Sequence, residues 1–356
     1  MQGPESTPGT IHRVLLRLEK IAARLSPKRL PGERAYVRCF EGYAHGSKLV
    51  IRGRVERKRE LRASDVNDSR RRNFLNMASN FFTKEIPHAT VHGEILGERF
   101  QVVCDEEGYF VHHLEHHSLP QASSIEFTAR VERADDPSHE SAKSSGIVTL
   151  CPATAKRIII SDVDDTVIET GAAKLWQLLK NTLLENVHTR RIFPGVSKFY
   201  TRLQAGPTGH ERNPIFYVTS SPWNLRDFIL KIFEIRNTPR GPLFMTDWGI
   251  DRHKLLKAGH HDHKLGAIRH LLSFHEPLPA ILIGDSGEKD PEIYTQIVEE
   301  HPERIAAIFI RNVSQSLRDE EIRLLAQACH GHGVKLHLVA DTKAAVAEAK
   351  ASGFIA

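Results

Sequence analysis

The segment Ile158-Ile159-Ile160-Ser161-Asp162-Val163-Asp164-Asp165-Thr166 decides the fold class of this 356-residue chain. Its apolar half is typical of a buried β-strand, and its acidic half follows where the strand should end. In open α/β sheets, ligands bind at the carboxyl ends of the strands. We therefore expect Asp162 at a strand end and Asp164 in the next loop, both facing one crevice. The alternative is an Asp-rich turn that caps the following helix.

A second strand end repeats this design farther along the chain. The apolar run 281–284 is followed by Asp285 and, five residues later, by Asp290. Two acidic strand ends can meet only if their strands are neighbours in one parallel sheet. One carboxylate then suits nucleophilic attack and another suits proton transfer, and a divalent cation would hold both in place.

Two further segments carry groups that suit a phosphate. The apolar run 214–218 ends in the hydroxyls of Thr219 and Ser220, and hydroxyls and loop N–H groups bind phosphate oxygens. Lys264 opens a segment whose apolar residues have helical spacing. A cation is unfavourable at the start of a helix, so we expect Lys264 to act elsewhere. The pattern of elements predicts an α/β Rossmann-like domain, a parallel sheet with helices on both faces.

The order acids, hydroxyls, lysine, acids resembles the four motifs of the haloacid dehalogenase (HAD) superfamily of phosphotransferases. Four segments are similar to the App1 group of Mg-dependent phosphatidate phosphatases: Asp-Val-Asp-Asp-Thr-Val (162–167), Thr-Ser-Ser-Pro-Trp-Asn (219–224), Asp-Trp-Gly (247–249) and Gly-Asp-Ser-Gly-Glu-Lys-Asp-Pro-Glu-Ile-Tyr (284–294). The resemblance is strong over about 155–345 and weak before it. It implies a phosphoric monoester hydrolase of lipid metabolism that converts phosphatidate to diacylglycerol.

The resemblance also implies a role for each matching residue. Asp162 would attack the phosphomonoester and form an aspartyl-phosphate. Asp164 would protonate the leaving group and then deprotonate the attacking water. Either Thr219 or Ser220 would bind the phosphate, and Lys264 would balance its charge.

The cofactor implied by the resemblance is Mg²⁺. Its protein ligands would be the Asp162 carboxylate, the Asp164 backbone carbonyl and Asp285, with Asp290 as a further or supporting ligand. Such hard oxygen donors suit Mg²⁺. We read Asp165 as a charge at the helix start or as support for these ligands.

Organisation along the chain predicts four regions. We expect an N-terminal amphipathic helix in 1–33, a small all-β sandwich resembling transthyretin-like domains in 34–133, a polar linker in 134–150 and the HAD-like catalytic domain in 151–356. The insertion before the second motif strand is short, which indicates a small cap and an open site.

Composition bounds the partners. A net charge of +5 and a pI near 9.0 favour anionic partners in general. Among anionic partners, the resemblance implies a phospholipid substrate at a membrane surface and no nucleic acid. Basic residues in 11–25 and 52–62 could meet anionic lipid, although solvated helix faces are commoner. Four scattered cysteines and no long apolar run indicate a cytoplasmic, at most peripheral protein. The oligomeric state stays open.

Other functions remain possible at this level. A catalytically silent lipid- or partner-binding module could use the same scaffold, and a phosphatase could act on a soluble phosphomonoester or a phosphoprotein. The presence of Asp162 favours an enzyme. Histidines gather at 112–117 and 260–263 without a familiar zinc spacing, so we expect surface or packing roles. A histidine of the second group, beside Lys264, could instead assist phosphate binding or protonate the leaving group. Trp176, Trp223 and Trp248 flank the motifs, either as core residues or as membrane anchors.

Overall fold

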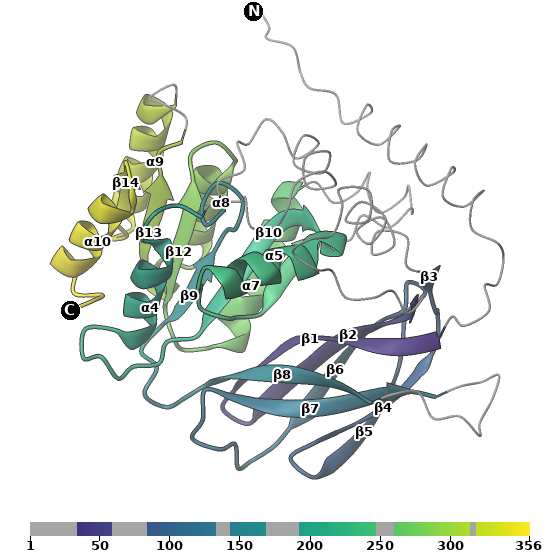
Figure 1. Ribbon diagram of the computed structural model, residues 1–356. Helices are drawn as coiled ribbons and strands as arrows, with labels where there is room; N and C mark the ends of the chain where they lie inside the picture. Colours follow the sequence, from purple (N-terminus) through teal and green to yellow (C-terminus); the bar gives the residue numbers. More distant parts are fainter. Residues whose placement is uncertain (1–33, 59–83, 133–142, 169–191, 247–259, 314–317) are drawn as a thin grey trace, which may run out of the picture.

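A computed structural model gives the structure (Figure 1) and describes residues 34–58, 84–132, 143–168, 192–246, 260–313 and 318–356. Two predicted features lie outside the described residues: the amphipathic helix within 1–33 and the Asp-Trp-Gly segment 247–249. The described chain forms a strand-rich N-terminal unit and an α/β unit, each built around its own sheet.

The first sheet has eight strands among the described residues, in the order β3-β2-β1-β8-β7-β4-β5, with β6 beside β2. They are β1 (Arg34–His45), β2 (Lys48–Lys58), β3 (Lys84–Glu85), β4 (Thr90–Ile95), β5 (Glu98–Val103), β6 (Tyr109–Glu115), β7 (Ser124–Val131) and β8 (Ser144–Cys151). All pairs are antiparallel except β1 with β8, so the sheet is mixed. Its inward side chains enclose one apolar core that includes Val37, Ile51, Phe110 and Phe127.

The linker expected over 134–150 is wrong in its second half. Strand β8 begins at Ser144 and lies between β1 and β7 in the middle of the sheet. Small polar residues are typical of linkers, but here Gly146 is needed for packing: a Cβ at this position would lie 2.3 Å from the ring of Phe127. A glycine within a strand often marks a place where a group from a neighbouring strand approaches the backbone closely, as the Phe127 ring of β7 does here. Residues 133–142 lie outside the described part.

The second sheet has six parallel strands in the order β11-β10-β9-β12-β13-β14. They are β9 (Ile158–Ser161), β10 (Ile215–Pro222), β11 (Leu243–Thr246), β12 (Ala280–Asp285), β13 (Ile305–Arg311) and β14 (Leu336–Val339). Counted in chain order from β9, this is the 3-2-1-4-5-6 order of doubly wound sheets, whose ligands bind where the order reverses. The reversal falls between β9 and β12, the two strands that end in the predicted acids.

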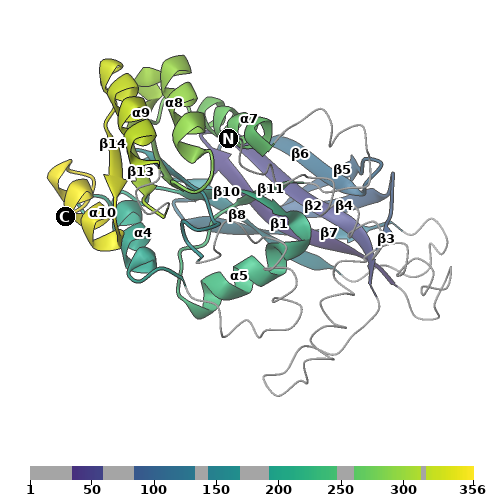
Figure 2. The ribbon, with the colours of Figure 1, turned by 90° about the horizontal axis from the view of Figure 1, so that it is seen from above.

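Helices cover both faces of this sheet (Figure 2). One face carries α4 (Val196–Ala205), α5 (Arg226–Ile235) and α10 (Thr342–Ala351), and the other carries α7 (His260–Phe274), α8 (Asp290–Glu300) and α9 (Asp319–Gly331). Short 3₁₀ turns occupy η3 (Trp223–Leu225) and η4 (Pro302–Arg304). Ile159 packs toward α4 while Ile158 and Ile160 pack toward α7, as expected for a strand buried on both faces. In the described part of the chain, no helix combines the length and apolar character needed to cross a membrane.

The two units share part of a hydrophobic core. Tyr43 and Val50, from β1 and β2, belong to the apolar cluster under α7. The Tyr43 ring packs against Phe274 with ring centroids 4.8 Å apart, and its hydroxyl lies 2.6 Å from His270 Nε2. The basic stretch 52–62 is therefore not wholly exposed: Arg52 donates to the Leu243 carbonyl across the interface at 3.3 Å. Residues 59–62 lie outside the described part.

Candidate active site

The two acidic strand ends lie at the same edge of the sheet. Asp162 follows β9, and its N–H donates to the Ile283 carbonyl of β12 at 2.8 Å. Asp285 is the last residue of β12. Both side chains are buried, at 1% and 0% exposure. Because β9 and β12 are hydrogen-bonded neighbours, the expectation that the two acidic ends meet in one parallel sheet is confirmed.

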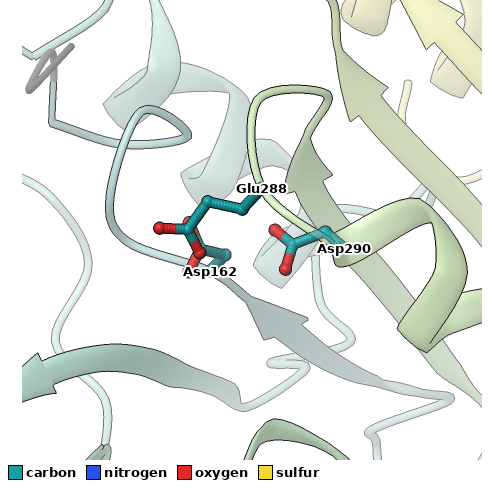
Figure 3. Close-up of side chains that lie close together, drawn as sticks. All are labelled: Asp162, Glu288 and Asp290. Carbon is teal, nitrogen blue, oxygen red and sulfur yellow. The ribbon is translucent and has the colours of Figure 1, made fainter. Parts of the chain in front are cut away.

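Lys264 lies at the centre of the acidic group. Its ammonium nitrogen is 2.8 Å from Asp162 Oδ1, 2.6 Å from Asp290 Oδ1 and 2.9 Å from Glu288 Oε2. An ammonium has three N–H donors, so three carboxylates can occupy them all. Figure 3 shows the three carboxylate side chains converging. The Asp162 and Asp290 side chains are 1% and 0% exposed, whereas Glu288 is 32% exposed.

Asp164 is held by hydroxyls from β10. Thr219 Oγ1 donates to Asp164 Oδ2 at 2.6 Å, and Ser221 Oγ donates to the same oxygen at 2.8 Å. Thr219 and Ser221 share one side of the strand because side chains alternate along it. Ser220 therefore points the other way and is half-buried, while its carbonyl accepts a hydrogen bond from Thr246 Oγ1 at 2.8 Å. The structure thus brings Thr219 to Asp164 and adds Ser221, which we had not selected from the sequence.

The carboxyl groups resist ionisation because they are buried together. Burial and the neighbouring Asp290 and Glu288 carboxylates raise the pKa of Asp285 to about 8. Burial also raises the pKa of Asp162 well above its ordinary value, against the opposing effect of Lys264. Burial acts to lower the pKa of Lys264, yet its carboxylate partners raise it well above normal. One lysine therefore balances an excess of acids, a site that favours additional positive charge.

The residues present fit a hard divalent cation. Carboxylate oxygens of Asp162, Glu288 and Asp290 lie within 4.8 Å of one another. The second oxygens of Asp162 and Asp285 are buried and have no hydrogen-bond partner among the described residues. Buried carboxylate oxygens without donors are costly unless a cation or water meets them, and an all-oxygen set suits Mg²⁺. Glu288 was missed from the sequence, although its position between Asp285 and Asp290 in one loop was a usable signal.

The loop that carries these acids is fastened from two sides. Asp285 Oδ1 accepts hydrogen bonds from the N–H groups of Gly287 at 2.6 Å and Glu288 at 3.1 Å. Arg318, just before α9, donates to the carbonyls of Ser286 at 2.9 Å and Glu288 at 2.6 Å. No sequence pattern pointed to Arg318, because its contacts depend on how the segment before α9 returns to the sheet.

Histidines do not form a comparable group in the described part of the chain, where the acidic cluster alone has three ligand atoms at metal-binding spacing. The His112 ring stacks on Phe100 with centroids 5.1 Å apart, a packing role. Trp223 packs between the two units, while Trp176 and Trp248 lie outside the described residues.

Comparison with known proteins points to one family. Residues 157–312 match the family model described as the catalytic domain of phosphatidate phosphatase APP1. Phosphatidate phosphatase APP1 of Saccharomyces cerevisiae is 26% identical over 290 residues, which cover 78% of this chain and 47% of that protein. An uncharacterized protein of Schizosaccharomyces pombe is 33% identical over 166 residues, 44% of this chain and 25% of that protein. The chain spans less than half the length of these relatives. The resemblance to App1-like phosphatidate phosphatases is confirmed.

Solved structures add no fold assignment. A carbohydrate acetylesterase from Xanthomonas citri aligns with a TM-score of 0.27 and 10% identity over 81% of this chain and 72% of that chain. A β-glucuronidase from Parabacteroides merdae gives a TM-score of 0.25 and 8% identity over 83% and 38%. Both scores are too low to indicate a shared fold.

Proposed function

We propose that the protein is a Mg²⁺-dependent phosphoric monoester hydrolase of the HAD type that converts phosphatidate to diacylglycerol. It would act as a peripheral, cytoplasmic enzyme at a membrane surface. The observation that carries the proposal is Asp162, a buried carboxylate at the switch point of the sheet, 2.8 Å from the Lys264 ammonium. The match of residues 157–312 to the APP1 catalytic domain supports the choice of substrate.

The nucleophile is Asp162. Its backbone is fixed by the hydrogen bond to Ile283, so the carboxylate presents an oxygen at a defined place. Attack on phosphorus forms the aspartyl-phosphate and expels the alkoxide of the lipid. Lys264 opposes the effect of burial on the pKa of Asp162, which favours the ionised carboxylate, and then offers positive charge to the transferring phosphoryl group.

Proton transfer is assigned to Asp164. Both hydroxyl donors bind its Oδ2, which leaves Oδ1 to protonate the leaving alkoxide and later to accept a proton from water. Burial raises the pKa of Asp164 while the hydrogen bonds from Thr219 and Ser221 lower it. A carboxyl group tuned upward in this way is suited to act first as acid and then as base.

The phosphate would rest between Lys264 and the loop after β10. Thr219 is committed to Asp164, so the half-buried Ser220 is the hydroxyl we assign to phosphate oxygens, together with loop N–H groups. Mg²⁺ would be held by the carboxylates of Asp162 and Asp285 and the Asp164 carbonyl, with Asp290 and Glu288 beside them. When bound, it supplies the charge that offsets the phosphoryl oxygens.

A phosphate-release assay tests this function. Phosphatidate in mixed micelles and soluble phosphomonoesters are compared with Mg²⁺ and with excess EDTA. We expect Mg²⁺-dependent release, greatest from phosphatidate. Release mainly from a soluble ester would keep the chemistry and replace the substrate. No release from any ester, with Mg²⁺ bound, would leave a silent binding module and refute the proposal.

A further inference from the structure

The segment that follows β10 is held by the N-terminal strand unit. The guanidinium of Arg54, from β2, lies 4.0 Å from the ring centroid of Trp223. The Tyr109 ring, from β6, meets Trp223 edge-on at 6.0 Å between centroids and 87° between planes. A guanidinium over an indole is among the stronger cation–π pairs, and it strengthens where water is excluded.

Arg54 is itself fixed in place. It is only 2% exposed, and its Nε donates to the Glu107 carbonyl at 2.9 Å. Its guanidinium also lies 4.4 Å from the centroid of Tyr109. An arginine so placed cannot follow the indole if the indole moves, which makes Trp223, Arg54 and Tyr109 a rigid clamp.

The start of α5 is attached to the same unit by ion pairs. Arg226 Nη2 donates to both carboxylate oxygens of Glu41, at 2.8 and 2.7 Å. Arg38 pairs with Asp227 and is backed by Glu56, which is fully buried and accepts from Arg38 at 3.0 Å. The Arg226–Glu41 pair is largely buried, whereas Asp227 is about half exposed. Hydrogen-bonded ion pairs fix geometry even where they add little net stability. The chain from 223 to 227 is therefore placed by strands β1 and β2.

Trp223 of the clamp is two residues after Ser221, which donates to Asp164. Ser221 and Thr219 hold Asp164 Oδ2, and Trp223 follows immediately after β10 ends at Pro222. A displacement of Trp223 pulls on the strand end that carries both hydroxyls. Misplacement by about 1 Å of a group that orients a catalytic side chain can cost about 10²-fold in rate.

We infer that Trp223 is a positioning residue, which the strand-rich unit uses through Arg54 to hold the β10 hydroxyls against Asp164. The N-terminal unit is then part of the scaffold of the active site. The effect on catalysis rests on the proposed function. The claim that Trp223 holds the β10 segment in place does not depend on that function.

The first arm of the test needs no activity. Hydrogen exchange, read by mass spectrometry on the full chain, compares wild type with Arg54→Ala, Trp223→Ala and Phe354→Ala. Phe354→Ala is the matched control, since it also removes a contact between an arginine and an aromatic ring. The Arg157 guanidinium lies 5.0 Å from the Phe354 ring centroid, and Arg157 directly precedes β9, whose start is at the edge of the sheet opposite the site. We expect exchange in 219–227 to rise about threefold or more in the first two variants and not in the control, with 280–285 unchanged in all three.

The second arm of the test measures general-acid catalysis by Asp164. Kinetics with Mg²⁺ compare glycerol 3-phosphate, whose alkoxide needs protonation, with p-nitrophenyl phosphate, whose leaving group does not. Because a general acid contributes about 10²–10⁴-fold, loosening Asp164 should cost about tenfold more in kcat on the alkyl ester. Trp223→Phe keeps a ring over Arg54 and should restore most of the loss, while Phe354→Ala should affect both esters equally.

Each outcome decides the inference. Faster exchange with a selective loss on the alkyl ester supports it. Unchanged exchange in 219–227 overturns it, and so does faster exchange with equal losses on both esters. If wild type releases phosphate neither from these two esters nor from phosphatidate, the proposed function fails, and the exchange arm still decides whether the clamp holds the β10 segment.

Discussion

At the scale of single residues, Glu288 is the member of the acidic group with the most freedom. It is the most exposed of the three carboxylates on Lys264, so an incoming phosphate is expected to take its place on the ammonium. Glu288→Gln weakens that competitor, and since a hydrogen bond to a charged group is worth about 1.5–3 kcal/mol, inorganic phosphate should inhibit about tenfold more tightly. Weaker phosphate inhibition with a raised Mg²⁺ requirement would instead make Glu288 a metal ligand. Glu299→Gln, at an exposed position near the end of α8, is the control.

Asp285 gives a pH-dependent prediction. Its pKa in the metal-free fold is about 8, far above its ordinary value, because its own burial and the neighbouring Asp290 and Glu288 carboxylates disfavour its charged form. A folded pKa above the unfolded one gives stability that is full below about pH 4 and is lost as pH rises through about 8. Bound Mg²⁺ favours the ionised form, so the rise in Tm on adding Mg²⁺ should be larger at pH 8 than at pH 6. Asp285→Asn should reduce that difference in thermal melts, and an equal rise at both pH values in wild type would contradict the account.

At the scale of elements, the β12–α8 loop depends on Arg318. Its donation to two loop carbonyls and its pairing with Glu292 hold the backbone of the acid-bearing segment. Arg318→Lys keeps the charge but cannot reproduce the forked contacts, so Mg²⁺ affinity measured by calorimetry should fall about threefold to tenfold, with a small change in Tm. Unaltered Mg²⁺ binding in this variant would show that the loop holds its shape alone.

The sequence predicts the parts of these elements that obey local rules. Apolar runs that end in acids locate β9 and β12, and parallel-sheet topology then brings Asp162 and Asp285 to one edge. Ser221, Arg318 and the Arg54–Trp223 contact could not be found in this way, because each depends on packing between distant segments. Strand β8 was misread as a linker because the reason for Gly146 is the ring of Phe127 on another strand.

At the scale of the whole molecule, the shared core predicts joint unfolding. All four motifs lie after residue 155, which by itself suggests that a fragment from about 147 keeps the chemistry. Tyr43, however, packs among Phe216, Phe244 and Phe274 of the α/β unit. Removal of a large buried aromatic costs about 3–5 kcal/mol, so Tyr43→Ala should lower the Tm of one cooperative transition. Tyr43→Phe, which loses only the contact with His270, should cost about 1 kcal/mol. If the thermal melt instead shows two transitions and Tyr43→Ala lowers the Tm of only one of them, the strand-rich unit and the α/β unit unfold independently.

The central claim is that Asp162 carries the phosphoryl group, and the most direct measurement is mass spectrometry of acid-quenched enzyme after brief mixing with substrate and Mg²⁺. The account predicts a phosphorylated peptide that maps to Asp162 in wild type. In Asp162→Asn the label should be absent and turnover should fall below about a hundredth of wild type, with an unchanged thermal melt, because no other group is placed to form the covalent intermediate. Retention of more than about a tenth of the wild-type rate by that variant, or phosphate found on another residue, would contradict the account.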